Sequence, residues 1–283
     1  MTTRTTTDRQ GTEPLGAGPG SGPAVGHPAS HPPITSAGPG VPFAALLRVE
    51  TRKLVDTRSG RWLLIAIGLV TALVVTVLLF AADASDLTFS NLFGATAIPQ
   101  GVLLPVLGIL AVTSEWSQRT GLVTFTLEPR RMRVAVAKLL AAVLVGVLAV
   151  VLALGCAAVV NVLATWLVGG DGAWHLSGSV VGGAVLLQVL GVAQGVAFGM
   201  VLLNTPAAIV TYFALPMVWS ILGGMVSWLH DAAQWLDLNV TTAPLVEGSM
   251  DARAWEHLAT SVGLWVVLPL VVGVWRLLHR EVK

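Results

Sequence analysis

Long apolar stretches alternate with short polar connectors along most of this 283-residue chain. Six stretches reach about 20 residues, the length that a helix needs to cross a bilayer core about 30 Å thick. The second stretch contains Pro99 and Pro105, which we expect to kink or interrupt its helix because proline lacks a backbone donor. The pattern therefore predicts six membrane-spanning helices, over about residues 62–82, 92–113, 134–168, 180–203, 206–229 and 258–278.

The composition agrees with a membrane protein. The chain is 54% hydrophobic and only 11% charged, whereas soluble domains carry about 25% charged residues. A nucleic-acid-binding protein would need a clustered basic face on a soluble domain, and the sequence offers none. We therefore predict an all-α, multi-pass protein of the plasma membrane, in contact with the lipid bilayer and without a nucleic-acid partner.

The first 42 residues differ from the rest of the chain. From Gly11 onward they are rich in Gly, Pro, Ser, Thr and Ala and have few large apolar side chains. Such a segment cannot bury enough apolar surface to offset the entropy of ordering it. It also has no apolar run in its first 30 residues, so it does not read as a secretory signal peptide. We predict a disordered cytoplasmic tail over residues 1–42 and a transmembrane domain over residues 43–283.

The positive charges are segregated among the connectors. Of the sixteen Lys and Arg residues, all except Arg253 lie before the first stretch, from the second connector to the start of the third stretch, or at the C-terminal end. Connectors rich in Lys and Arg stay on the cytoplasmic side during insertion. Six spans with both termini in the cytoplasm satisfy this rule, whereas five or seven would leave one terminal basic cluster outside.

An amphipathic helix is predicted ahead of the first span, over residues 43–61. Apolar residues recur there at helical spacing, and Arg52 lies on a different face. A helix of this kind lies in the inner interface of the membrane, where its cations meet anionic headgroups. Glu50 is expected to pair with Lys53 or Arg52.

Several kinds of chemistry lack their motifs. No Gly-Lys pair is present, so there is no phosphate-binding loop of the Walker type and we expect no ATP hydrolysis by this chain. No HExxH pattern or paired metal ligands occur, and we predict no catalytic residues, metal site or bound cofactor. The span cores carry no ionisable side chain, which disfavours an ion-driven transporter.

Three glycines are spaced by four residues in the fourth span: Gly191, Gly195 and Gly199. This spacing places them on one helix face, where a second helix can approach closely. The sequence favours packing within the subunit over a dimer interface, but both arrangements fit the spacing.

The connector between the second and third spans carries an ordered set of short motifs. On physical grounds alone it reads as a solvated basic loop. Its motifs, however, together with Glu50 and Lys53 ahead of the first span, resemble permease subunits of type-two ABC exporters, the ABC-2 membrane family, over about residues 43–280. The connector motifs are Ser114-Glu115, Thr120-Gly121, Pro129-Arg130-Arg131 and Ala137-Lys138.

This resemblance implies the transmembrane subunit of an ATP-driven exporter. The connector would contain a coupling helix that docks on a separate cytoplasmic ATPase, and ATP and magnesium would bind to that ATPase. Two permeases would pair as a homodimer or heterodimer, and residues 230–256 would form short re-entrant or interfacial helices. The residues implied to contact the ATPase are Glu115, Trp116, Arg119 and Thr120.

Two other classes of function remain open. One is a membrane interaction or regulatory protein without transport activity. The other is a membrane enzyme or secondary transporter, which would need catalytic or ionisable groups that converge within the bilayer. The apolar spans suit a lipid-like or drug-like substrate, but they suit any membrane protein equally, so the sequence does not identify the substrate.

Overall fold

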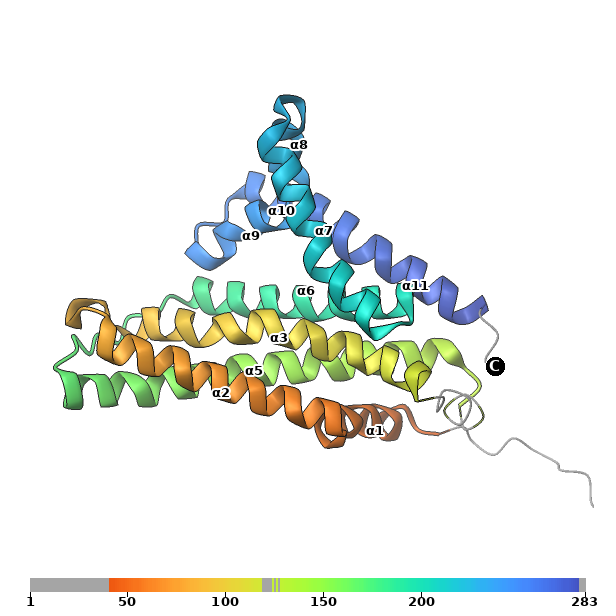
Figure 1. The fold of residues 1–283 in the computed structure, drawn as a ribbon, viewed down its shortest axis with the longest axis horizontal. Coiled ribbons are helices and arrows are strands. Elements are labelled where there is room, and N and C mark those ends of the chain that lie inside the picture. Colours follow the sequence, from red (N-terminus) through yellow and green to blue (C-terminus); the bar gives the residue numbers. More distant parts are fainter. Residues whose placement is uncertain (1–40, 119–123, 125, 127, 280–283) are drawn as a thin grey trace, which may run out of the picture. The chain divides into compact units, whose positions relative to one another are not determined.

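A computed structural model of the chain describes residues 41–118, 124, 126 and 128–279. The predicted disordered tail lies outside the described residues except for Val41 and Pro42. Helices are the regular elements of the described part, and no strand occurs in it. In chain order (Figure 1) they are α1 (Phe43–Asp56), α2 (Arg58–Ala81), the short 3-10 helix η1 (Ala84–Asp86), α3 (Phe89–Ser117), α5 (Arg131–Val168), α6 (Gly178–Leu202), α7 (Thr205–Met225), α8 (Ser227–Leu236), α9 (Leu238–Glu247), α10 (Ala252–Val262), the π-helical turn η2 (Gly263–Val267) and α11 (Leu268–His279).

Six helices of the described part are long and apolar enough to cross a membrane, which confirms the number predicted from the sequence. They are α2, α3, α5, α6, α7 and the continuous run α10–η2–α11. The first span begins at Arg58 rather than residue 62, because the amphipathic helix already ends at Asp56 and the Thr57 hydroxyl caps α2. The fifth span ends at Met225 rather than residue 229, because the backbone becomes extended at Val226.

The prolines affect two spans differently. We expected Pro99 and Pro105 to kink or interrupt the second span. Helix α3 continues through both residues, so neither interrupts it. In the sixth span the π-helical turn η2 ends at Val267, two residues before Pro269. Proline has no N–H to donate to the carbonyl four residues earlier, and such a gap favours a locally widened turn.

Helices α3 and α6 form the centre of the described fold. Helix α3 packs against α2, α5 and α6, and α6 also contacts α7, α9 and α11. In their most apolar segments, 50% of α3 and 56% of α6 is buried, against 17% of α2 and 11% of α7. The exposed apolar side chains of α2 and α7 suit a lipid environment, in which such surface carries no penalty.

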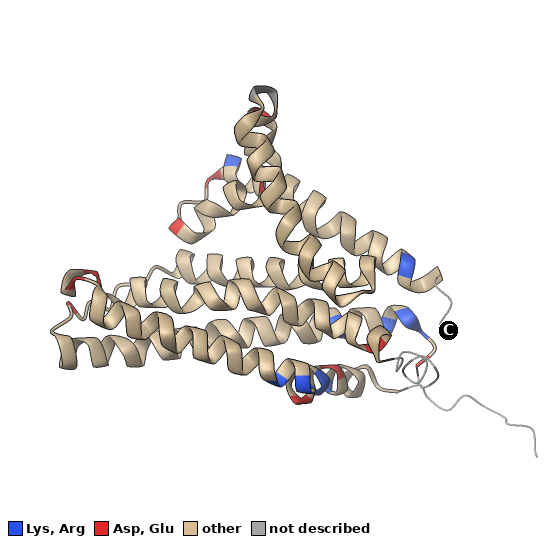
Figure 2. Cartoon of the chain, viewed as in Figure 1, with Lys and Arg blue, Asp and Glu red and all other residues tan. Residues whose placement is uncertain are grey.

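Most charged residues lie near two ends of the helices, and most Lys and Arg residues gather at one of them (Figure 2). We call one the basic end: it comprises α1, the start of α2, the end of α3, the start of α5 and the end of α11. Hydrogen bonds between helices at this end include those that Arg131 donates to the Leu277 carbonyl at 3.0 Å and Arg276 donates to the Val201 carbonyl. The other, the acidic end, comprises residues 82–91, 169–177 and 227–256.

Short helices follow the fifth span at the acidic end. Helices α8 and α9 have 10 residues each, in the region where the resemblance implies short helices. Trp265 Nε1 donates to the Leu236 carbonyl at 2.6 Å, and the hydroxyls of Thr241 and Ser261 lie 2.6 Å apart. These bonds attach α8 and α9 to the sixth span.

Candidate functional site

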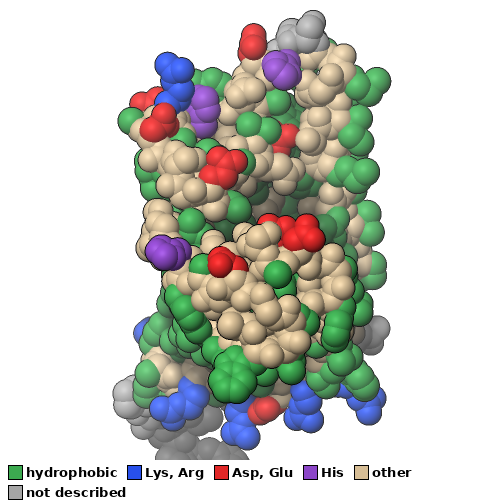
Figure 3. All heavy atoms as spheres, turned by 90° about the vertical axis from the view of Figure 1, so that its left-hand side faces the viewer, with side chains coloured by type: hydrophobic (Ala, Val, Ile, Leu, Met, Phe, Trp, Pro, Cys, Tyr) green, Lys and Arg blue, Asp and Glu red, His purple; other side chains and the backbone are tan. Residues whose placement is uncertain are grey.

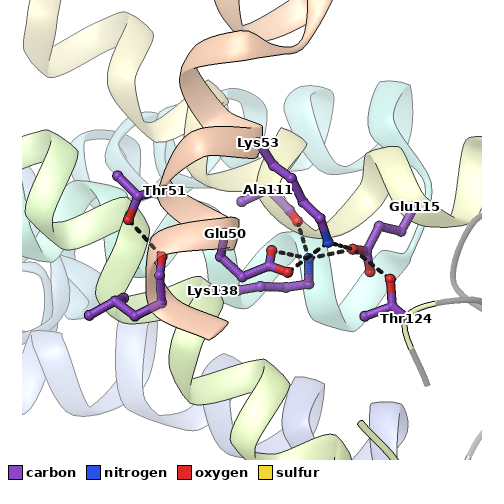
Figure 4. A network of polar contacts seen from close by, with 8 residues as sticks. Glu50, Thr51, Lys53, Ala111, Glu115, Thr124 and Lys138 are labelled. Atoms are coloured by element: carbon purple, nitrogen blue, oxygen red, sulfur yellow. Dashed lines mark hydrogen bonds and ion pairs between the residues drawn. The ribbon is translucent and has the colours of Figure 1, made fainter. Parts of the chain in front are cut away.

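Two lysines and two glutamates form a closed ion-pair network at the basic end (Figure 4). Helix α1 supplies Glu50 and Lys53, α3 supplies Glu115, and α5 supplies Lys138. Lys53 Nζ lies 2.7 Å from Glu50 Oε1 and 2.9 Å from Glu115 Oε1. Lys138 Nζ lies 2.8 Å from Glu50 Oε2 and 2.9 Å from Glu115 Oε1. Each lysine therefore contacts both carboxylates, and the four groups connect three helices.

The network is neutral and mostly buried. The side chains of Glu50 and Lys138 are each 3% exposed, that of Glu115 is 8% exposed and that of Lys53 is 38% exposed. Lys138 also donates to the Ala111 carbonyl at 3.0 Å, and Glu115 accepts from the Thr124 hydroxyl at 3.2 Å. Buried charges are tolerated when they are paired and hydrogen-bonded, and this network meets both conditions.

The local sequence explains why Glu50 is buried. Leu46, Glu50 and Leu54 are spaced by four residues, so they lie on one face of α1, and all three are buried. Leu46 packs with Val134 and Ala137 of α5. A carboxylate within this apolar stripe needs a cationic partner, and Lys138, one turn beyond Val134 in α5, provides it.

Lys53 links the network to its more open side. Partial burial alone would lower the pKa of Lys53, but the carboxylates of Glu115 and Glu50 outweigh burial and raise this pKa above its ordinary value. Lys53 is therefore cationic at neutral pH.

A second ion pair fixes the start of α5. Arg133 Nη1 lies 2.6 Å from Glu128 Oε2, and Arg133 Nη2 donates to the Val41 carbonyl at 2.8 Å. Glu128 is buried and also accepts from the Arg130 backbone N–H at 3.3 Å. The connector between α3 and α5 is thus attached at two points: its Thr124 bonds Glu115 of α3, and its Glu128 pairs with Arg133 of α5, which also bonds Val41, two residues before α1.

A cavity of about 480 Å³ adjoins the network. It lies between α1, the start of α2 and the end of α3, and its lining is mainly apolar, with Leu54, Leu107 and Ala111 among the residues. All four network residues also line it.

The residues predicted to contact an ATPase have different surroundings. The Glu115 carboxylate is turned inwards to Lys53 and Lys138, and Trp116 is half-buried against the apolar core. Arg119 and Thr120 lie outside the described residues. The ATPase contact implied for these four residues stays a prediction, and for Glu115 the structure adds an internal role.

Sequence reasoning proposed the Glu50–Lys53 pair but missed the other half of the network. For Lys138, the sequence patterns indicate only a place in a family motif and a position among the cytoplasmic positive charges. The available signal was Lys138 itself, a charged residue within the apolar pattern that begins the third span. A buried lysine needs an anionic partner, and Glu50 is an acidic residue that lies in a similar apolar stripe.

The three glycines of α6 face helices of the same chain. A Cβ at Gly195 would collide with the Pro105 carbonyl of α3, and one at Gly199 would lie 3.1 Å from the Ile109 carbonyl oxygen. At Gly191 the nearest atom, Pro105 Cγ, would be 3.4 Å away, which is ordinary contact. The glycines therefore allow α3 and α6 to approach closely at the centre of the fold.

The network joins α1, α3 and α5. Its carboxylates are neutralised by lysines, and within the described residues no group of three or more His, Cys, Asp or Glu side chains converges as metal ligands would. Comparison of the sequence with models of protein families and with curated proteins finds no match in either.

Proposed function

We propose that this chain is the transmembrane subunit of an ATP-driven exporter of the ABC-2 type, with ATP hydrolysis in a separate cytoplasmic subunit. The observation that carries the proposal is the attachment of the connector between α3 and α5. Its Thr124 donates to Glu115 of α3, which pairs with Lys53 of α1 and Lys138 of α5. Its Glu128 pairs with Arg133 of α5, which also donates to the Val41 carbonyl. A partner that docks on this connector would act on three helices at once.

The charge distribution supports the orientation. All described Lys and Arg residues except Arg253 lie at the basic end, and the positive-inside rule would place this end, and with it both termini, in the cytoplasm. The connector would then be accessible to a cytoplasmic ATPase, which binds the ATP and magnesium. The acidic end would face outwards, across the plasma membrane, and a second permease copy, identical or similar, would complete the transport path.

The network suits the transmission of movement. Each lysine contacts both carboxylates, so a shift of α3 that weakens one contact of Glu115 leaves the other lysine paired to it. Buried charges that lost all partners would oppose movement by about 3–5 kcal/mol. Shared partners avoid this cost, and Glu115 would act as a positioning residue that couples the connector to α1 and α5.

The test is co-expression of the full chain with the ABC ATPases of the same genome, followed by purification and ATPase assays. The wild-type chain should co-purify with one ATPase and change its rate of ATP hydrolysis. Glu115→Gln keeps the side-chain size but removes the charge, and it should weaken this effect about fivefold or more. Glu256→Gln is the matched control, an exposed glutamate at the acidic end, and it should have no effect.

Thermal unfolding of each variant separates lost coupling from lost folding. If no ATPase binds the folded wild-type chain, the exporter proposal fails and a membrane interaction or regulatory protein is favoured. If an ATPase binds and responds equally to the wild-type chain and to folded Glu115→Gln, the coupling role of the network is wrong.

A further inference from the structure

A second cavity, of about 890 Å³, opens near the acidic end. Parts of α2, α3, α5, α6 and α9 surround it, and apolar residues such as Phe93, Val150 and Leu187 provide most of its lining. Cavities that bind small molecules usually have about 300–1,000 Å³, mostly apolar walls and a few polar groups. This cavity has both the size and the wall composition of such a site.

A buried polar group in its lining has no hydrogen-bond partner among the described residues. Gln188 of α6 is only 6% exposed, and its Nε2 is buried without a hydrogen bond. Its aliphatic part lies against α5, because a Cβ at Gly146 would be 3.4 Å from Gln188 Cγ. Burying an amide donor without an acceptor costs about 1–3 kcal/mol. A bound molecule with a hydrogen-bond acceptor would remove this cost.

In the described part of the chain, the charged residues that line the cavity are both acidic. They are Asp86 and Glu247, and no described Lys, Arg or His lines it. Among the described residues, neither carboxylate forms an ion pair with a basic side chain. Figure 3 shows acidic side chains across the face at this end, whereas most of the Lys and Arg visible lie at its lower margin. A cleft lined by charge of one sign attracts ions of the other sign.

We propose that this cavity binds an amphipathic organic cation, which would be the exported substrate. Its cationic group would lie by Asp86 and Glu247 and its apolar body against Phe93 and Leu187. An acceptor atom of the molecule would accept a hydrogen bond from Gln188 Nε2. The assignment as substrate rests on the exporter proposed above, whereas the binding itself does not.

The test is equilibrium binding to the purified full chain in phosphatidylcholine nanodiscs, with empty nanodiscs as background. The probe is rhodamine 6G, a fluorescent amphipathic cation with an ester carbonyl, measured by anisotropy. Fluorescein shares its ring system but is anionic, so it should bind at least about tenfold more weakly. Binding of rhodamine 6G should also weaken with added salt, because the carboxylates are exposed.

Substitutions assign the contacts. Gln188→Leu removes the donor at similar volume and should weaken rhodamine 6G binding about fivefold to tenfold. Gln194→Leu is its control, because Gln194 is a buried, unpartnered glutamine of the same helix outside this cavity. Asp86→Asn should also weaken binding, whereas Asp231→Asn, at an exposed aspartate outside the lining, should not.

The proposal is overturned if fluorescein binds as tightly as rhodamine 6G, or if folded Gln188→Leu binds the cation like the wild-type chain. In the latter case water or lipid satisfies the amide. Because the ATPase is absent, this result is separate from the exporter test. Binding without any ATPase partner would support the cavity alone, and ATPase coupling without binding would refute the cavity alone.

Discussion

Replacement of Lys138 by methionine is the sharpest test of the ion-pair network. Methionine has a similar length and fills the same space, so the main change is the loss of one buried positive charge. Glu50 and Glu115 would then share Lys53 alone, and the network would carry a net negative charge. The Ala111 carbonyl would also lose the bond from Lys138.

The magnitude follows from burial. The side chains of Lys138 and Glu50 are each 3% exposed, so solvent cannot replace the missing partner. Removal of one member of a buried pair costs about 3–5 kcal/mol. Arg52→Met is the matched control, because its ion pair with Asp56 joins side chains that are 81% and 49% exposed. Exposed pairs of this kind contribute about 0.2–1 kcal/mol.

A double variant, Lys138→Met with Glu50→Gln, should be more stable than Lys138→Met alone. It leaves Lys53 and Glu115 as a neutral pair, and neutrality is the property that the single variant lacks. Residues in direct contact couple by about 0.5–3 kcal/mol in such cycles, so we expect a recovery in this range.

The assay is unfolding by titration with sodium dodecyl sulfate in mild detergent micelles, followed by the fluorescence of the ten tryptophans. The reasoning is refuted if Lys138→Met is no less stable than Arg52→Met. It is also refuted if Glu50→Gln brings no recovery in the Lys138→Met background.

Three further predictions concern other parts of the described fold. The pKa of Lys53 is raised, so its ion pairs contribute their full stability below pH 10.5 and are lost as pH rises through the higher pKa. The unfolding midpoint of the wild-type chain should therefore fall above pH 10.5. Lys53→Met should reduce this fall. Gly195→Ala should destabilise the protein by about 1–3 kcal/mol, since its Cβ meets backbone, whereas Gly191→Ala should change the unfolding free energy little. Trp265→Phe should lose the bond to the Leu236 carbonyl, about 0.5–1.5 kcal/mol, and amide hydrogen exchange in α8 and α9 should become faster; unchanged exchange would contradict this role.

The sequence predicted the secondary structure better than its interruptions. Span number follows from composition, because a bilayer requires helices of a certain length and apolar content. The extended residue Val226 and the continuous α3 were not predictable in the same way. Whether a proline breaks a span depends on which neighbouring groups satisfy the freed carbonyls, and those neighbours come from other helices.

The candidate site was predictable only in part. Glu50 and Lys53 lie three residues apart, so helical geometry alone brings them together. Their other partners, Glu115 and Lys138, are 62 and 88 residues further along from Lys53 and Glu50, respectively. No local pattern specifies a contact over such a separation.

By itself, the sequence determined that this is a multi-pass helical membrane protein. It also determined the six spans, the amphipathic helix ahead of them and the separation of charge, because each follows from local composition. The tertiary structure decided which buried charges neutralise each other, that the α6 glycines meet α3 within one chain, and that Gln188 lines a cavity without a partner. The physical reason is that a charge, a close approach or an unmade hydrogen bond depends on its surroundings, and only the packing of helices distant in sequence creates them.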